Sequence, residues 1–262
     1  MKKIKTLLLC GLFIISSELS AWGTTGHRVV AEIAQNHLSA KARRQLQKII
    51  GKQSLAYWAN WSDFIKSDPE WKMADSWHYL NIPSGMNRDN FDSLLNHSTD
   101  VHLYKRTLTI IDELKDRKNL SLEKQQQNLY FLIHLLGDAH QPLHLGREED
   151  LGGNKIEVKW FRNTTNIHSL WDSKLIDFQK YSYTEYAKVL DIHDKKINKN
   201  LSDGNLEDWL FESYQKAEDI YAHTKKDDNL WYDYNYRYVS TLEEQLLKGG
   251  LRLAKILNEV FG

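Results

Sequence analysis

Apolar side chains recur every three to four residues through most of this chain, the spacing that places them on one face of an α-helix. The stretches that carry this pattern most clearly span residues 29–38, 103–114, 128–140, 206–222 and 241–261. Only Pro69, Pro83 and Pro142 interrupt the chain after residue 21, so few positions forbid a helix. The pattern therefore predicts an all-α fold.

Local signals add detail to this prediction. Ser39 and Ser121 precede helical patterns and are predicted to be N-caps, because a serine oxygen can accept a hydrogen bond from the first helical turn. Residues 155–160 alternate in polarity after a Gly-Gly-Asn turn, which predicts a short strand or β-hairpin near residues 152–162. The aromatic run 231–238 is expected to pack a loop against the C-terminal helix.

Residues 1–21 have the organisation of a secretory signal peptide. Lysines come first, an apolar stretch spans residues 7–15, and the small residue Ala21 closes the segment. The apolar stretch is too short to span a membrane, and the bulky Leu8 and Leu9 before Cys10 do not suit lipid attachment. We therefore expect a secreted or periplasmic monomer without a membrane anchor. Its one domain would span residues 22–262, since no linker or repeat divides that stretch.

Charge and cysteine content narrow the kinds of site that this domain can carry. The whole chain has 35 basic and 35 acidic residues, and residues 1–21 hold three lysines and one glutamate, so the domain itself is slightly acidic. A polyanion would find no general basic surface, and affinity for phosphate must come from a local source. Cys10 is the only cysteine of the chain, so metal ligation would have to replace disulfides in the exported domain.

A set of candidate metal ligands supplies such a source. The nine residues are Trp22, His27, Asp63, His78, His134, Asp138, His144, His168 and Asp172. His134 and Asp138 are four residues apart, as are His168 and Asp172, so a helix would place each pair on one face. Histidine nitrogen combined with carboxylate oxygen favours zinc, whereas calcium prefers oxygen ligands alone. The spacing predicts a trinuclear zinc site.

Three neighbouring features support this interpretation. Pro142 ends the helix that carries the first pair, so His144 can turn toward another metal ion. Cleavage after Ala21 would free the α-amino group of Trp22, which can chelate a metal together with its own carbonyl oxygen. His140 is a candidate for orienting a ligand carboxylate. A lone buried histidine is usually a core residue, but that explanation would have to hold for five histidines at once.

The motifs around these residues resemble those of the zinc-dependent single-strand nucleases of fungi, plants and bacteria, the S1/P1 nuclease family, which is distantly related to bacterial zinc phospholipase C. The resemblance covers essentially all of the chain after residue 21. The motifs that carry it are Trp22-Gly23 through Gly26-His27, Trp61-Ser62-Asp63, Ser76-Trp77-His78-Tyr79, residues 134–144, Gly152-Gly153-Asn154 and residues 168–172.

This resemblance implies a compact multi-helix domain of the zinc phospholipase C and single-strand nuclease type, with three zinc ions. The implied ligand sets are Asp63, His78, His134 and Asp138 for one ion; His144, His168 and Asp172 for a second; and His27, the main chain of Trp22 and the bridging Asp138 for the third. It implies a phosphodiesterase in which a metal-bound hydroxide attacks phosphorus in line and leaves 5′-phosphorylated products. A 3′-nucleotidase activity is expected from the same chemistry.

The resemblance also assigns residues to the substrate. Asp63, Lys66 and Asp138 are the expected catalytic residues, and Lys66 matches a position that contacts phosphate. Tyr79 and Asn81 match a base pocket in which the fungal members carry Phe and Asp, so stacking is retained while base preference is open. Lys66, Tyr79, Asn81 and Asn154 are the predicted substrate-binding residues. A recessed metal cluster takes a splayed base more readily than a paired one, so single-stranded DNA and RNA are the expected substrates.

Two other classes of protein remain as alternatives. A zinc phospholipase C would use nearly the same ligands, although that group carries glutamate at the position of Asp172, and it would release a phosphorylated headgroup from lipid. A non-enzymatic exported protein could use zinc only for stability. Structural zinc sites are closed and typically rich in cysteine, and this domain has none and offers more ligands than one such site requires.

Overall fold

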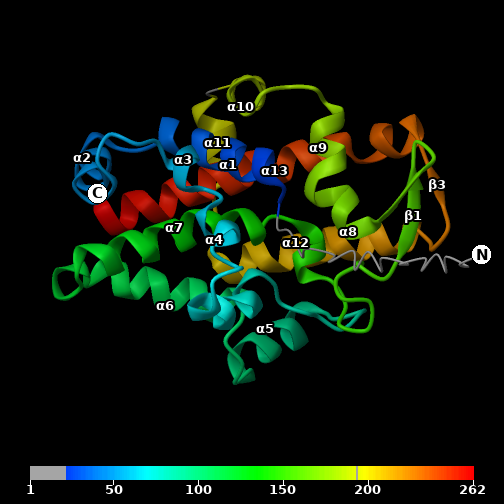
Figure 1. Cartoon of the computed structure of the whole chain (residues 1–262), viewed down its shortest axis with the longest axis horizontal. Helices are drawn as coiled ribbons and strands as arrows, with labels where there is room; N and C mark the ends of the chain where they lie inside the picture. Colours follow the sequence, from blue (N-terminus) through cyan, green and yellow to red (C-terminus); the bar gives the residue numbers. More distant parts are fainter. Residues whose placement is uncertain (1–21, 193) are drawn as a thin grey trace, which may run out of the picture.

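A computed structural model describes residues 22–192 and 194–262 (Figure 1). The predicted signal peptide, residues 1–21, lies outside the described residues. The α-helices are α1 (Thr24–Asn36), α2 (Ala40–Ile50), α3 (Leu55–Trp58), α4 (Trp61–Phe64), α5 (Arg88–His97), α6 (Leu103–Lys115), α7 (Leu122–Asp138), α8 (Ile167–Ser169), α9 (Leu175–Phe178), α10 (Tyr183–Leu190), α11 (Lys195–Leu201), α12 (Leu206–His223) and α13 (Tyr232–Phe261). The prediction of a mainly helical fold is confirmed.

Short segments of other geometry connect these helices. The 3₁₀ segments are η1 (Pro69–His78), η2 (Arg117–Asn119) and η3 (Pro142–Leu145), and η4 (Leu170–Lys174) has π-helical geometry. The strands are β1 (Glu157–Trp160), β2 (Asn163–Asn166) and β3 (Asn229–Leu230). The strand β1 pairs antiparallel with β2 and parallel with β3, which confirms the predicted hairpin. The two residues of β3 were not predicted, because so short a strand has no period to detect.

Each of the five predicted helices is present, and the main difference concerns where α13 begins. The aromatic run 231–238 was expected in a loop, but all of it after Trp231 forms the first turns of α13. Tyr234, Tyr238 and Leu242 are buried four residues apart, so the aromatic residues continue the apolar face of this helix. The expectation of a loop was therefore wrong.

Helix α7 lies at the centre of the molecule, where α1, α6 and α13 pack against it (Figure 1). All residues from Asn128 to Asp138 are buried, so this part of the helix is covered on every side. The predicted N-cap of α7 is confirmed, because Ser121 Oγ accepts a hydrogen bond from the Lys124 N–H at 3.2 Å. Ser39 caps α2 in the same way, accepting from the Ala42 N–H at 3.1 Å. The core thus surrounds the segment that carries two candidate ligands.

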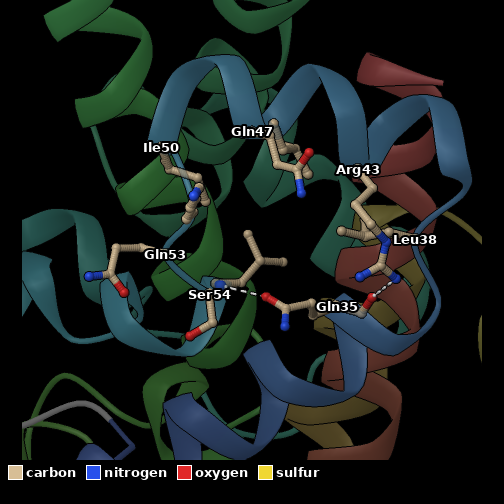
Figure 2. Close-up of a pocket in the computed structure, with 11 residues that line it drawn as sticks. Gln35, Leu38, Arg43, Gln47, Ile50, Gln53 and Ser54 are labelled. Carbon is tan, nitrogen blue, oxygen red and sulfur yellow. Dashed lines mark hydrogen bonds between the residues drawn. The ribbon is translucent and has the colours of Figure 1, made fainter.

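Two observations concern the surface of the described residues. None of their helices combines the length and the apolar character that crossing a membrane requires. A pocket of about 130 Å³ lies between α1, α2 and α3, where Gln35 accepts a hydrogen bond from the Leu55 N–H and Arg43 donates to the Gln35 carbonyl (Figure 2). Its lining contains none of the candidate ligands, so this pocket is separate from the predicted site.

Candidate metal centre

Eight of the nine candidate ligands meet as side chains in the interior of the molecule. They form three groups of possible metal ligands, which are His27 with Asp63 and His134, His78 with His134 and Asp138, and His144 with His168 and Asp172. Within each group, one nitrogen or oxygen atom from every residue lies within 4.8 Å of the others. These residues come from α1, α4, η1, α7, η3, α8 and η4, so packing of distant segments builds the centre.

The two helical pairs have the geometry that their spacing predicted. His134 Nε2 lies 3.4 Å from Asp138 Oδ2 on α7, and His168 Nε2 lies 3.3 Å from Asp172 Oδ2. The helix α7 ends at Asp138, and Pro142 then begins η3, which directs the chain back toward the centre. Each pair therefore presents a nitrogen and an oxygen at a separation that a single cation can bridge.

Hydrogen bonds fix the rings of three histidines. The Nδ1 atoms of His134, His144 and His168 lie 2.6–2.7 Å from the carbonyl oxygens of Ala59, His78 and Gly152, respectively. A carbonyl oxygen only accepts hydrogen bonds, so each Nδ1 carries a proton, and in the neutral ring Nε2 then has the free lone pair. This is the second contact that metal-binding histidines characteristically make.

Buried nitrogens without partners are the clearest sign that a cation fits here. Both ring nitrogens of His27 and the Nε2 atoms of His78, His134 and His144 are buried without a hydrogen-bond partner among the described residues. Buried polar atoms are almost always paired, because leaving one unpaired costs about 1–3 kcal/mol. So many in one place indicate that the residues are arranged to bind a ligand, and nitrogen and carboxylate donors suit zinc.

Burial is the main cause of the pKa shifts of His27, His78 and Asp172 at the centre. Burial lowers the pKa of His27 and of His78 to about 4, so both rings are neutral at neutral pH. Burial raises the pKa of Asp172 to about 8, since a carboxylate in the interior is unfavourable unless a cation balances it. Burial acts the same way on Asp138, but the adjacent His134 and other histidines hold the pKa of that carboxyl well below its usual range.

Two glycines allow the segments to approach closely enough. A Cβ atom on Gly137 would lie 2.5 Å from His27 Nδ1, so a side chain there would displace this ring. Gly152 has a φ of 62°, and a Cβ atom there would lie 2.6 Å from the Leu143 carbonyl oxygen. Because the Gly152 carbonyl holds His168, both glycines are needed for the positions of these candidate ligand rings.

Trp22, the ninth candidate, lies beside this centre. Its side chain is fully buried, and the next residue, Gly23, donates its N–H to the carbonyl oxygen of Asp172 at 2.6 Å. A Cβ atom on Gly137 would lie 3.6 Å from Trp22 Cδ1. The beginning of the described chain is therefore held against the segments that carry Asp172 and Asp138.

Comparison with known proteins identifies the family. The model of the S1/P1 nuclease family matches residues 22–262. The chain belongs to the S1/P1 nuclease family. Endonuclease 4 of Arabidopsis thaliana is 29% identical over 92% of this chain and 89% of its own length. Nuclease P1 of Penicillium citrinum is 29% identical over 92% of this chain and 98% of its own length. Nuclease S1 of Aspergillus oryzae is 27% identical over 90% of this chain and 91% of its own length.

Family membership confirms the resemblance seen in the sequence and the prediction that this protein is a nuclease, a hydrolytic phosphodiesterase. Among solved structures, the alpha toxin from Clostridium absonum is similar with a TM-score of 0.48 and 18% identity, over 94% of this chain and 66% of that chain. The family assignment depends on the sequence comparisons alone.

Lys66 and Asn154, two of the residues predicted to bind substrate in this S1/P1 nuclease, contact other parts of the protein. Lys66 Nζ lies 2.5 Å from Asp63 Oδ1, one helical turn away, and a quarter of its side chain is exposed. The side-chain Nδ2 of Asn154 donates to the Leu151 carbonyl oxygen at 2.9 Å and so stabilises the turn that contains Gly152. Lys66 therefore stands at the solvent side of a candidate ligand.

Tyr79 and Asn81, the predicted base-pocket residues, share one side of an extended segment. Leu80 and Ile82 are buried, whereas Tyr79 and Asn81 are half-buried, as expected from the alternation of an extended chain. The Leu80 N–H donates to the His144 carbonyl oxygen at 2.8 Å. Both residues consequently come within three positions of the candidate ligand His78, and they flank Leu80, which is hydrogen-bonded to the candidate ligand His144.

The sequence did not predict which residue contacts the Asp172 carboxylate in the nuclease centre. His140 does not orient a ligand carboxylate, because its Nδ1 donates to the Leu136 carbonyl at 2.7 Å and its Nε2 accepts from Arg252 at 3.1 Å. The next residue, Gln141, makes that contact by donating from Nε2 to Asp172 Oδ1 at 2.5 Å. The only sequence signal for Gln141 is its position between two ligand residues, which does not distinguish it from His140.

Proposed function

We propose that this S1/P1 nuclease uses three zinc ions to hydrolyse phosphodiester bonds in single-stranded DNA and RNA, and that its products carry 5′-phosphates. The same centre would remove a 3′-terminal phosphate from nucleotides. The observation that carries the proposal is the set of three buried ligand groups with unpaired histidine nitrogens. Family membership supports the reaction class.

Asp138 would bridge two of the ions. Its Oδ1 lies 3.4 Å from His27 Nε2, while its Oδ2 lies 3.0 Å from His78 Nδ1 and 3.4 Å from His134 Nε2. The two oxygens thus face histidines from different segments, which supports one carboxylate shared between two metal positions. Asp63 would complete the position formed by His78, His134 and Asp138, since its Oδ1 lies 3.5 Å from His134 Nε2.

The remaining ligands would form the other contacts. His144, His168 and Asp172 would hold one ion by themselves, since they form a separate group. The main chain of Trp22 would supply an amine and a carbonyl oxygen to the ion shared by His27 and Asp138. The family match begins at this same residue, which supports removal of residues 1–21 during export to the periplasm or the medium.

Bound zinc would lower the pKa of water and offset negative charge on phosphate oxygens. The protein would then position and stabilise the substrate. Lys66 would offer a cation to the phosphate on the exposed side of Asp63, and Tyr79 would stack on a base whose edge Asn81 contacts. Asn154 would contribute from the turn beside His168. These residues suit a splayed single strand, because a base paired in a duplex cannot reach a stacking ring.

The two alternatives explain less of the molecule. A phospholipase C would need a site for a lipid headgroup, and the sequence comparisons point to nucleases instead. A protein that binds zinc only for stability would not need a partly exposed lysine beside a ligand carboxylate. We also expect the domain to act as a monomer, since all nine proposed ligands come from one chain.

The test is release of acid-soluble nucleotides by the chain starting at Trp22, with single-stranded DNA, RNA and duplex DNA as substrates. Release of 5′-phosphorylated nucleotides from both single strands, lost on chelation, recovered with zinc and absent in Asp138→Asn, is the expected result. No release from the folded, zinc-loaded protein would contradict the proposal. Release of phosphorylated headgroups from phospholipid vesicles by the same samples would favour the phospholipase.

A further inference from the structure

Gln141 connects the main chain around one ligand to the side chain of another. Its side chain is fully buried. Oε1 accepts a hydrogen bond from the Leu143 N–H at 2.6 Å, and Nε2 donates to Asp172 Oδ1 at 2.5 Å. The side chain does not contact solvent, so the oxygen and the nitrogen of the amide each bond to these protein partners.

The orientation of the amide follows from its partners. A backbone N–H is only a donor, so the oxygen of Gln141 must face Leu143. The NH₂ group must then face Asp172, whose carboxylate is only an acceptor when a bound cation keeps it ionised. One fixed donor therefore points at one carboxylate oxygen. A side chain that lacked either function would leave a buried partner unpaired, which is unfavourable.

The contact decides how Asp172 is presented to its group. Gln141 holds Oδ1, which lies 3.6 Å from His144 Nε2, while Oδ2 lies 3.3 Å from His168 Nε2. Among the described residues, the Asp172 carboxylate has no other hydrogen bond that would fix its rotation about the terminal torsion. The donor from Gln141 is consequently the contact that keeps one oxygen toward each histidine.

The main chain of Gln141 reinforces this arrangement. Its N–H donates to the Asp138 carbonyl oxygen at 3.0 Å, and its own carbonyl accepts from the His144 N–H at 3.0 Å. The residue thus spans the interval between the last ligand of α7 and the ligand of η3. A side chain anchored on so short a loop has little freedom, so its donor position is well defined.

We propose that Gln141 is a positioning residue that holds Asp172 in the orientation required for metal binding, and that it thereby sets the affinity of the group formed by His144, His168 and Asp172. This inference rests on the proposed function, because it assumes that the group binds zinc. Gln141 itself binds no metal in this account and acts through Asp172. Contacts of this kind change metal affinity by about 10- to 100-fold when they are removed.

The test compares Gln141→Met, which keeps the volume but removes both polar functions, with Gln141→Asn, which keeps the amide on a shorter chain. The matched control is Gln245→Met. Gln245 is also fully buried, and it donates to the His140 carbonyl and to Ser213 Oγ at 3.0 Å without contacting a candidate ligand. Each protein is zinc-loaded, titrated with a chelator, and analysed for zinc per chain, with circular dichroism and Tm recorded in parallel.

The expected result is that one of three zinc ions leaves both Gln141 variants at a 10- to 100-fold lower chelator concentration than in the wild type. The control should lose stability but release its zinc ions as the wild type does. Equal zinc retention by the wild type and both Gln141 variants would overturn this inference and leave the proposed function intact. A wild type that holds no zinc would overturn the proposed function and this inference with it.

Discussion

The two ring nitrogens of the ligand histidines have separate tasks. In His134, His144 and His168 one nitrogen donates to a main-chain carbonyl, and the other is left with its lone pair directed at the candidate ligands. The ring orientation is therefore set before any cation binds. Preorganised ligands lose little conformational freedom on binding, which favours tight binding.

Lys66 is the residue whose substitution separates catalysis from metal binding. Lys66→Met should lower kcat by about 10²-fold, because the cation that we propose beside the transferring phosphate would be lost. The zinc content should not change, since an ammonium group does not bind zinc. Lys72→Met is the matched control, because Lys72 pairs with Asp75 at the same spacing but on the exposed surface. Unchanged kcat in the Lys66 variant would show that this lysine is only an ion-pair partner of Asp63.

His140 should make the stability of the domain sensitive to pH. Burial, together with the adjacent Arg252, holds the pKa of His140 well below 6.5 in the folded state. The unfolded chain takes up a proton near pH 6.5 while the folded chain does not, so this residue lowers stability as the pH falls below that value. A glutamine could keep both hydrogen bonds without titrating.

The free energy of unfolding should therefore fall more steeply with acid in the wild type than in His140→Gln. Below pH 6.5 the difference between the two proteins should shift in favour of the variant by about 1 kcal/mol per pH unit. Urea unfolding of the zinc-loaded proteins at pH 7.5, 6.5 and 5.5 measures this shift. Comparing two proteins cancels the contribution of the metal ligands. A difference that does not depend on pH would refute the assignment.

At the level of elements, the sequence predicts what is local. The helices, the caps at Ser39 and Ser121, and the pairing of His134 with Asp138 all follow from spacing within one segment. The grouping of His27 with Asp63 depends instead on how α1 and α4 pack against α7. No spacing within one segment could reveal it, and the family resemblance placed the two residues in different ligand sets. The contact of Gln141 with Asp172 spans 31 positions, so no local pattern could reveal it.

Gly137 tests the packing of α1 against α7. Alanine is normally favoured over glycine inside a helix by up to about 1 kcal/mol. In Gly137→Ala we expect the reverse, a loss of about 1–3 kcal/mol, because the new methyl group would overlap the His27 ring. Zinc should also be lost from the group that contains His27. Unfolding curves and zinc analysis measure the two effects.

Gly51→Ala is the control for this substitution. Gly51 has a φ of 67° and nothing within 4 Å of an added Cβ atom, so the variant should be destabilised through its backbone alone. Its zinc content should equal that of the wild type. A Gly137→Ala protein that gains stability and keeps all its zinc would show that α1 and α7 approach less closely than described.

At the scale of the whole molecule, we propose that the position of Trp22 links export to metal binding. Trp22 is buried and the Gly23 N–H is hydrogen-bonded to the Asp172 carbonyl, so the first described residues lie beside the proposed metal centre. A chain that begins with Gly-Ser before Trp22 should bind two zinc ions instead of three and lose most of its nuclease activity. Proteolytic removal of the added residues should restore both, and an extended chain that keeps three ions and full activity would refute the role of this amine.

The central claim is that three zinc ions act together at one buried centre. The most direct measurement strips the Trp22-initiated protein with a chelator, adds zinc in known equivalents, and follows nucleotide release from single-stranded DNA. We expect the rate to reach its plateau at three equivalents and each ion to remain bound after gel filtration. A full rate at one equivalent, or a rate that does not depend on zinc, would contradict the trinuclear account.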